Sequence, residues 1–210
     1  MFSDDRGHKG RRNTKEEILN TSIELFSEYG ISAVSIRDIT KRVGINESSL
    51  YNHYKNKDEI LKVIIGKFRH DFGRAFSADA GDLRSRMEGI GPEVFFQHHV
   101  LDLRDRMSPT VQKIWKIIYL EMFRDKRVRD FFVNEALKVS SSFYEKVFEI
   151  MAEKGLIKAG DARLLADEFN FGFMAMQIEN MLLKTDNRDI DENVKRLFAH
   201  IRFICAAAVK

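Results

Sequence analysis

The stretch VGINESSLYNHYKNKDEIL, from Val43 to Leu61, predicts a tight turn followed by a short helix with a polar outer side. Gly44 can adopt the left-handed backbone that ends one helix, and Asn46 can cap the start of the next. That next helix, from about Glu47 to Tyr54, carries hydroxyl, amide and imidazole groups but little apolar surface. We therefore expect a helix that docks through few side chains and presents polar groups outward.

Two segments before this stretch complete a unit of three helices. Thr14, with Glu17 three residues later, forms a capping pattern that opens a helix, and this helix stops at Gly30. Ser35, followed by Asp38, opens a second helix that ends at the turn. The apolar residues of the second and third helices are spaced so that they can close a small core against the first: Ile39, Val43, Ile45 and Leu50.

The outer side of the third helix suits the major groove of DNA. A helix of about 8 residues is roughly 12 Å long, and the major groove is about 12 Å wide. Polar side chains on such a helix can reach base edges and phosphates. The alternative is a three-helix packing unit with an ordinary solvated face, but the apolar spacing and a basic N-terminal cluster favour DNA binding. This cluster comprises Arg6, Lys9, Arg11, Arg12 and Lys15.

Residues 14–61, TKEEILNTSIELFSEYGISAVSIRDITKRVGINESSLYNHYKNKDEIL, resemble the DNA-binding region of the TetR family of transcriptional regulators. The resemblance implies a long helix after the motif, a variable helical ligand domain, and dimerisation through a four-helix bundle. The sequence departs from the family at Thr40, where a small Ala is usual. The family's frequent Tyr-His-Tyr-Phe run also differs, because this chain has Tyr-Asn-His-Tyr at 51–54. The family's base preference therefore does not transfer.

The resemblance also implies which residues contact DNA. Residues at helix starts commonly hold phosphates. By the same resemblance, Tyr51 contacts phosphate through its hydroxyl, and Lys57 clamps a phosphate at the start of the fourth helix. The expected DNA contacts are Lys15, Ser35, Arg37, Asn46, Ser48, Ser49, Tyr51, Asn52, His53 and Lys57.

The rest of the chain predicts further helices, so the expected fold class is all-α. Hydrophobic residues make up 44% of the chain, prolines number only two, and apolar residues recur every three or four positions. Gly91-Pro92 and Ser108-Pro109 are typical helix starts. Longer helices are expected at about 127–154, 161–184 and 189–208. We divide the chain into an N-terminal arm with a helix-turn-helix domain (1–57), a connecting helix (58–78), and a ligand-binding and dimerisation domain (79–210).

Aromatic and Met side chains are concentrated after residue 78. Core packing accounts for most of them, yet an apolar pocket with a few polar groups is also where helices hold a small molecule. His99, Tyr119 and Gln177 could orient such a molecule through hydrogen bonds. The candidate pocket residues are Phe96, His99, Trp115, Tyr119, Met122, Phe123, Phe143, Phe173 and Gln177.

The last two helices predict a homodimer, because each carries an apolar stripe at helical spacing. Two such helices from each chain would form a four-helix interface. The recognition helices would then lie about 34–36 Å apart and read a near-palindrome. The candidate interface residues are Leu165, Phe169, Met176, Val194, Leu197, Ile201 and Ile204.

Together with the family resemblance, these features predict a ligand-responsive transcriptional regulator. The resemblance implies repression as the expected mode and a small hydrophobic or aromatic effector as the releasing signal. One alternative is a DNA-binding regulator without a small-molecule ligand. Another is a helical metal-dependent enzyme that uses His98 and Asp102, which lie four residues apart. A third metal ligand is not evident, and neither a phosphate loop nor a nucleophile motif occurs. We therefore expect no enzymatic activity and no cofactor.

The single cysteine, Cys205, excludes an intrachain disulfide and fits a reducing compartment. Without an obvious paired base, it is expected to be buried and inert. No apolar run approaches the ~20 residues of a membrane span, and the N-terminus lacks the apolar core of a signal peptide. We therefore expect a cytoplasmic protein without membrane association.

Overall fold

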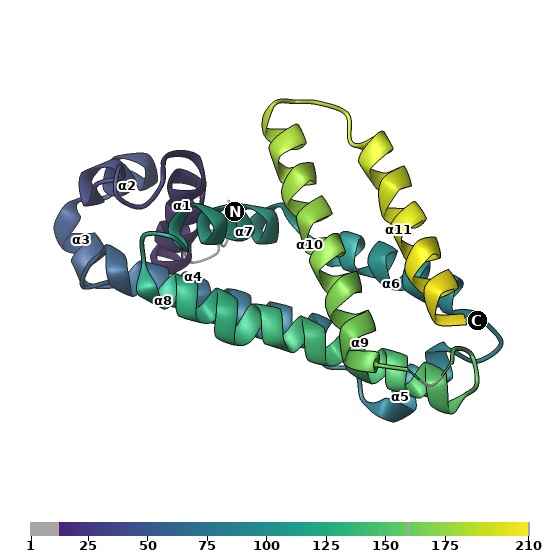
Figure 1. Ribbon diagram of the computed structural model, residues 1–210. Helices are drawn as coiled ribbons and strands as arrows, with labels where there is room; N and C mark the ends of the chain where they lie inside the picture. Colours follow the sequence, from purple (N-terminus) through teal and green to yellow (C-terminus); the bar gives the residue numbers. More distant parts are fainter. Residues whose placement is uncertain (1–12, 159, 210) are drawn as a thin grey trace, which may run out of the picture.

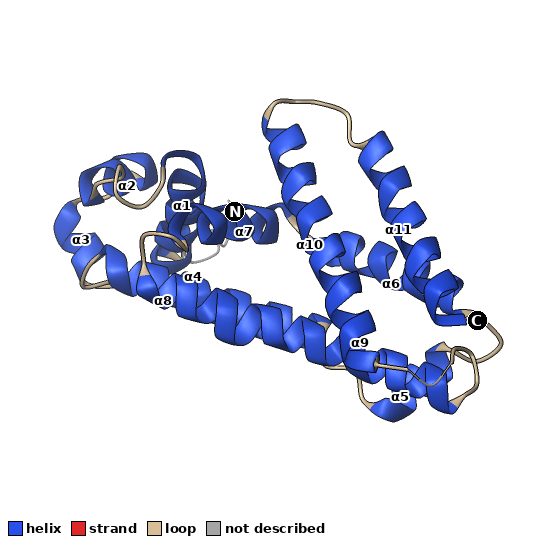
Figure 2. Ribbon diagram, viewed as in Figure 1, coloured by secondary structure: helices blue, strands red, loops and turns tan. Residues whose placement is uncertain are grey.

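Helices arranged along an elongated molecule make up the computed structural model, which describes residues 13–158 and 160–209 (Figure 1). Within these residues every regular element is helical, as Figure 2 shows, and the predicted all-α class is confirmed. Most of the basic N-terminal cluster, Arg6, Lys9, Arg11 and Arg12, lies outside the described residues.

The first helix, α1 (Thr14–Tyr29), is capped one residue earlier than the sequence pattern predicts. The side chain of Asn13 accepts a hydrogen bond from the backbone N–H of Glu16 at 3.3 Å, so Asn13 rather than Thr14 is the N-cap. The helix ends at Gly30, as predicted.

The turn between α2 (Ile36–Val43) and α3 (Glu47–Tyr51) has the predicted geometry. Ser35 and Asp38 form a complete capping box at the start of α2. Gly44 has φ 77° and ψ 40°, a left-handed conformation that side chains with a Cβ rarely adopt. The expected small core is confirmed, because Ile39, Val43 and Leu50 are buried and Ile45 packs against them.

Helix α3 is shorter than predicted: it ends at Tyr51 rather than near Tyr54. Tyr54 is buried, and its hydroxyl donates a hydrogen bond to the backbone carbonyl of Lys15 at 3.2 Å. After Tyr51 the backbone forms a turn, in which the N–H of Tyr54 still donates to the carbonyl of Leu50 at 2.9 Å, and Tyr54 lies against the start of α1.

Helix α4 (Lys57–Ala75) connects the α1–α3 unit to the rest of the molecule (Figure 1). The two Pro-initiated helices begin where predicted, and Asp161 caps α10. The predicted long helix at 127–154 is present as α8, a π-helical turn and α9 in continuous succession. The remaining helices are α5 (Ala80–Arg86), α6 (Pro92–Arg106), α7 (Pro109–Glu121), α8 (Lys126–Phe131), η1 (Phe132–Ala136), α9 (Leu137–Glu153), α10 (Ala162–Thr185) and α11 (Asp191–Val209).

Two hydrophobic cores hold these helices together. The first combines side chains of α1–α4 with α7 and α8, and the second combines α5, α6, α9, α10 and α11. The ring of Phe68 on α4 packs edge-on against Trp115 of α7, with ring centroids 4.8 Å apart. Helix α7 therefore packs directly on the α1–α4 unit, and the domain boundaries at residues 57 and 78 stay predictions.

Candidate nucleic-acid interface and internal cavity

The outer side of α3 faces away from the described chain. Tyr51 is 50% exposed, and Ser48 and Asn52 are exposed as well. Ser49 and His53 are half-buried, and Leu50 on the opposite side is fully buried. The helix therefore docks through Leu50 and leaves its polar groups accessible, as the sequence pattern predicts.

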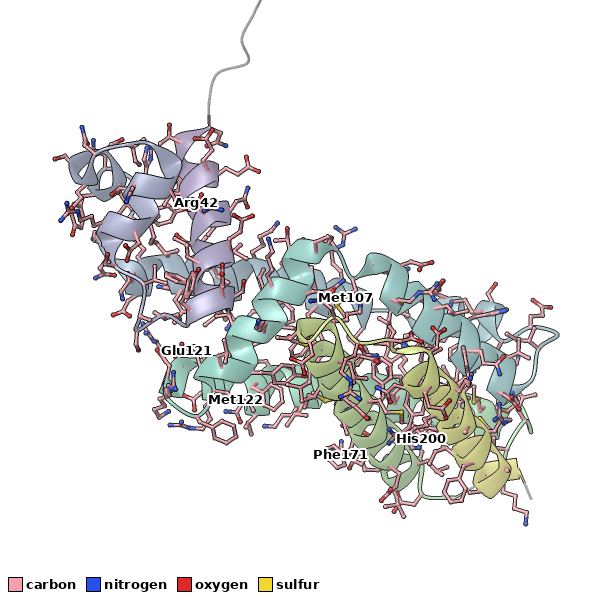
Figure 3. The ribbon with its side chains drawn as sticks, turned by 90° about the horizontal axis from the view of Figure 1, so that it is seen from above. Arg42, Met107, Glu121, Met122, Phe171 and His200 are labelled. Carbon is pink, nitrogen blue, oxygen red and sulfur yellow. The ribbon has the colours of Figure 1, made fainter. Side chains whose placement is uncertain are left out.

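Exposed cationic side chains flank α3. Besides the predicted Arg37, they include Lys41 and Arg42 on α2 and Lys55 after α3, and Figure 3 labels Arg42 on this end of the molecule. Among the described residues, none of the four forms an ion pair. The sequence analysis did not single out Lys41, Arg42 or Lys55. The sequence does carry a signal for the first two, because they are cations between the buried positions of α2. Such a surface suits the phosphates of a nucleic acid.

Ser35 has a local role that limits what its hydroxyl can bind. This hydroxyl donates to Oδ2 of Asp38 at 2.6 Å, and the backbone N–H of Asp38 donates to Oγ of Ser35 at 3.1 Å. The hydrogen bond from Ser35 lowers the pKa of Asp38 below its ordinary value. The predicted DNA contact of Ser35 is therefore better suited to the N–H groups of the first helical turn than to the hydroxyl.

Both of the predicted DNA-contacting lysines also hold the α1–α4 unit together. The ammonium of Lys57 donates to the carbonyls of Ile31 at 2.8 Å and Val34 at 2.6 Å, which leaves one N–H. The ammonium of Lys15 is exposed and lies 5.6 Å from the centre of the Tyr54 ring. The structural role of Lys57 was not foreseen from the sequence, and its contact with phosphate stays a prediction.

A cavity of about 690 Å³ lies between α4, α6, α7, α10 and α11. Four of the predicted pocket residues line it: Trp115, Tyr119, Phe173 and Gln177. Burial raises the pKa of the Tyr119 phenol, which keeps this hydroxyl protonated. Much of the remaining wall is aromatic or sulfur-containing, and it includes Phe72, Phe76, Met107, Met174, Met181 and Phe198.

Five predicted pocket residues do not line this cavity, which corrects the sequence-based set. Phe96 and Phe143 belong to the second core, and His99 is buried beside them: Phe96 packs against Phe148 and Phe169, and His99 packs against Phe143 of α9. Met122 packs against the first core, and Phe123 is 79% exposed in the turn after α7. The sequence shows that bulky side chains recur at helical spacing, but it does not show which of them face the cavity.

His99 instead joins a buried aromatic cluster. Its imidazole lies 3.3 Å from the hydroxyl of Tyr144 and stacks on Phe143, with ring centroids 5.0 Å apart. Burial, reinforced by the charges of Arg86 and Arg106, lowers the pKa of His99 to about 3. The imidazole is therefore neutral at physiological pH.

Charged side chains at helix ends make the wall of the cavity net positive. The single acidic group is Asp71, on α4. Cationic groups outnumber it, and all of them are exposed. A neutral or anionic molecule would therefore be favoured over a cationic one. The cationic residues are Arg74, Arg104, Arg106 and Lys184.

The predicted interface residues of α10 and α11 mostly face inward. Phe169, Leu197, Ile201 and Ile204 are buried in the second core of the chain itself, whereas Leu165, Met176 and Val194 are half-buried. These four buried residues therefore cannot form a surface for a second copy. The sequence-based assignment of the interface was wrong for these residues because each helix carries a second apolar stripe, shifted by one position along the chain.

This second stripe faces outward. On α10 it includes Leu164 and Phe171, each 56% exposed, and on α11 it includes Phe203, which is 69% exposed. Figure 3 shows Phe171 at the outer edge of the molecule, and His200 between the two helices. Ala175, Ala199 and Ala206 lie on the same exposed sides at helical spacing. The outer faces of α10 and α11 therefore combine large apolar side chains with small ones.

The alternative metal site gains no support from the geometry. Asp102 lies 3.5 Å from Arg86, and His98 is exposed. Within residues 13–158 and 160–209, no three His, Cys, Asp or Glu side chains are grouped as metal ligands would be. Cys205 is buried, as expected, and burial raises the pKa of its thiol to about 12. In the same part of the chain, no helix has both the length and the apolarity needed to cross a membrane.

Comparison with known sequences identifies relatives of the N-terminal part. The family profile described as "Bacterial regulatory proteins, tetR family" matches residues 18–64. The transcriptional repressor KstR2 of Rhodococcus jostii is 37% identical over 90 residues, which cover 41% of this chain and 43% of that protein. The negative transcriptional regulator IcaR of Staphylococcus epidermidis is 46% identical over 48 residues, which cover 23% of this chain and 26% of that protein. The chain thus spans less than half the length of these curated relatives.

Solved structures match nearly the whole chain. A Mesorhizobium loti structure assigned to the TetR family superimposes with a TM-score of 0.67 at 17% identity, covering 94% of this chain and 97% of that one. The complex of SmeT with triclosan superimposes with a TM-score of 0.64 at 18% identity, covering 95% and 93% of the two chains. At such identities the likeness establishes the shared fold, including the arrangement of the C-terminal helices.

Proposed function

Because residues 18–64 match the TetR-family profile and the fold matches structures of that family, we propose that the chain is a DNA-binding transcriptional regulator, a homodimeric repressor whose operator complex is released by a small apolar effector. One observation supports this proposal above all. The same chain has an uncovered polar helix flanked by cations at one end, and an apolar cavity of about 690 Å³ between its other helices. A DNA reader and a sensor of small molecules require these two features. Such a regulator acts where the bacterial chromosome lies, in the cytoplasm.

The proposed DNA contacts divide into two kinds. Asn52 and His53 have planar groups that can pair with base edges in the major groove. Tyr51, Arg37 and Lys55 would contact phosphates, which fix the position of the helix without reading sequence. Specificity is therefore expected to depend on the end of α3, and overall affinity on the surrounding hydroxyl and cations.

The proposed dimer pairs the outer faces of α10 and α11 with the same faces of a second copy. Exposed large apolar side chains on a helix pair favour burial against a partner. Phe171 and Phe203 supply the apolar area, and the small residues beside them allow close helix approach. A dimer of this kind presents two copies of α3, which supports the expectation of a near-palindromic operator.

Repression and an apolar effector are favoured by the relatives. KstR2 and IcaR are named as a repressor and a negative regulator. SmeT, which shares the fold, was solved with triclosan and is described as the repressor of a multidrug efflux pump. The alternative of a regulator without a ligand predicts a sensor region filled by its own side chains, and the open volume of the cavity argues against it.

Two helices could transmit effector binding to the DNA-binding end, since both α4 and α7 line the cavity and pack against the first core. Helix α7 ends at Glu121, which is only 4% exposed and accepts a hydrogen bond from the backbone N–H of Ile31 at 2.9 Å. Near its start, Lys113 pairs with Glu24 of α1 at 3.1 Å. Figure 3 shows α7 extending from near Met107 to Glu121, beside the α1–α3 unit. An effector that displaces α4 or α7 would therefore reposition α3.

An effector shifts the equilibrium only through its different affinities for the DNA-competent and displaced states. The test has two stages. The protein first selects duplexes from a random pool, and the selected duplex then serves as operator in a screen of apolar and aromatic compounds. We expect a near-palindromic duplex and at least one compound that lowers operator affinity more than tenfold. Selection of no preferred duplex, or of a duplex that no compound releases, would contradict the proposal.

A further inference from the structure

We propose that the effector carries a hydrogen-bond donor, such as a hydroxyl or an amide N–H, and that Asn170 selects for it. This inference rests on the proposed effector function of the cavity and specifies the chemical class of the molecule bound there. Asn170 lies on α10, is 1% exposed, and contributes to the cavity wall together with Ser140 of α9. Sequence reasoning passed over it, although a polar residue between Phe169 and Phe173 on an apolar stripe is a readable signal.

Only the nitrogen of the Asn170 amide has hydrogen-bond partners; its oxygen has none among the described residues. Its Nδ2 group donates to Oγ of Ser140 and to Oγ of Ser141, each at 3.0 Å. Its Oδ1 atom is buried, and no donor in the described part of the chain reaches it. A buried carbonyl oxygen without a donor is rare in proteins, and a ligand is one of the few explanations for it.

The two serines fix the orientation of this amide. The hydroxyl of Ser140 donates to the backbone carbonyls of Ala136 at 3.0 Å and Leu137 at 3.2 Å, so Oγ of Ser140 can only accept from Asn170. If the oxygen and nitrogen of the amide were exchanged, Oδ1 of Asn170 would face Oγ of Ser140, and both atoms would be hydrogen-bond acceptors. The nitrogen must therefore face the serines, and the oxygen must face away from them.

The side chain of Ser141 supports the same orientation. Burial opposes ionisation of Asp167, but hydrogen bonds from Arg163 and Ser141 lower the pKa of this carboxyl. Oγ of Ser141 accepts from the same Nδ2 group as Oγ of Ser140, so both serines lie on the nitrogen side of the amide.

Other polar groups of the wall lack this combination. The side chain of Asn180 is already paired, because its Oδ1 accepts from Nδ2 of Asn193 at 2.9 Å. Gln177 is half-buried, with no buried unpaired atom. Asn170 is therefore the lining residue that a ligand donor would relieve, within walls otherwise suited to apolar groups. Phenols, long-chain alcohols and apolar secondary amides fit this description.

The test compares compounds that differ only in the donor: para-phenylphenol with its methyl ether, and dodecanol with its methyl ether. Each is titrated into the full-length protein, and binding is followed through the fluorescence of Trp115, which lines the cavity and is the single tryptophan of the chain. Leaving a buried acceptor unpaired weakens binding by about tenfold. We therefore expect each donor to bind about tenfold more tightly than its ether.

Two variants assign this preference to one residue. In Asn170→Leu the donors and ethers should bind equally, whereas Gln177→Leu, which also replaces an amide of α10 in the cavity wall, should keep the preference. If Asn170→Leu does not fold, the comparison of donors with their ethers in the wild-type protein still tests whether the cavity selects for a hydrogen-bond donor. Ethers that bind the wild type as tightly as the donors would overturn the inference, because Oδ1 would then be satisfied in another way, such as by a retained water.

The remaining outcomes separate this inference from the proposed function. Binding of none of the four compounds would overturn the inference, because the cavity would then not accept apolar donors of these sizes. Release of the selected operator by a compound of another class would still leave the effector-responsive function standing. Loss of the preference in Gln177→Leu would also overturn the assignment to Asn170.

Discussion

His99 links the stability of the fold to pH through a single imidazole. In the folded protein burial lowers its pKa to about 3, whereas in an unfolded chain a histidine titrates near 6.5. Below about pH 6.5 the unfolded state therefore binds a proton that the folded state does not accept until about pH 3. The stability contributed by the neutral imidazole is complete above about pH 6.5 and is lost as the pH falls through this window, by up to about 1.4 kcal/mol per pH unit.

We therefore predict that the free energy of unfolding falls more steeply with acid in the wild type than in His99→Gln. Between pH 7.5 and pH 5 the extra loss should be about 2 kcal/mol. Urea denaturation at the two pH values measures it, and the other histidines cancel in the comparison. Equal losses in the two proteins would show that the folded state accepts this proton easily.

A second prediction at the scale of residues concerns Lys57 and its neighbour Lys55. Lys57→Ala leaves the carbonyls of Ile31 and Val34 without their donor, so the free energy of unfolding should fall by about 1.5–3 kcal/mol. Lys55→Ala removes an exposed cation and should change the stability by less than about 0.5 kcal/mol. Chemical denaturation compares the two, and equal stability would mean that the Lys57 bonds contribute nothing.

At the scale of elements, the sequence predicts best what local chemistry controls. The capping box at Ser35 and Asp38, the left-handed Gly44 and the two Pro-initiated helices were all foreseen, because each depends on residues a few positions apart. The end of α3 was not foreseen, because it depends on Tyr54 reaching Lys15 across the fold. Local rules contain no information about such a contact.

The orientation of α10 and α11 about their own axes shows a second limit of sequence reasoning. Both helices carry apolar side chains on two neighbouring stripes, and periodicity alone cannot decide which stripe packs inward. The same ambiguity placed Phe96, His99 and Phe143 in the cavity rather than in the core. Only the positions of the surrounding helices decide which side of a helix lines a cavity.

One element-scale prediction concerns the link from α7 to the loop after α1. Glu121→Leu removes the acceptor of the Ile31 N–H, so hydrogen exchange at this amide should accelerate by about tenfold or more. Glu121→Gln keeps an acceptor oxygen and should preserve most of the protection. Exchange followed by nuclear magnetic resonance measures both variants. Protection unchanged in Glu121→Leu would mean that α7 does not hold this loop.

At the scale of the whole molecule, the order and number of long helices follow from the sequence, but the sharing of α7 between the DNA-binding end and the cavity does not. The sequence places α7 in the ligand domain by its position in the chain. Its buried residues Ile114, Ile117 and Ile118 instead join the core of α1–α4. This arrangement depends on contacts between residues some ninety positions apart, such as Ile31 and Glu121.

The proposed dimer gives a prediction at this scale. Phe203→Glu places a charge on the outer face of α11 and should convert the dimer to monomers at micromolar concentration, because burying an unpaired charge is strongly unfavourable. Phe123→Glu changes a phenylalanine in the turn after α7 that is even more exposed, and this variant should remain dimeric. Analytical ultracentrifugation distinguishes them. A monomeric wild type, or a dimeric Phe203→Glu, would contradict the proposed interface.

The claim that α3 reads DNA is tested most directly by comparing the duplexes that the wild type and Asn52→Ala select from one random pool. We predict a near-palindromic sequence for the wild type, and for Asn52→Ala a relaxed preference at symmetric positions, with about 1–3 kcal/mol less discrimination there. His98→Ala, which changes an exposed side chain on α6, should select the wild-type sequence. If Asn52→Ala selects the wild-type sequence with undiminished discrimination at every position, the assignment of base reading to α3 is contradicted.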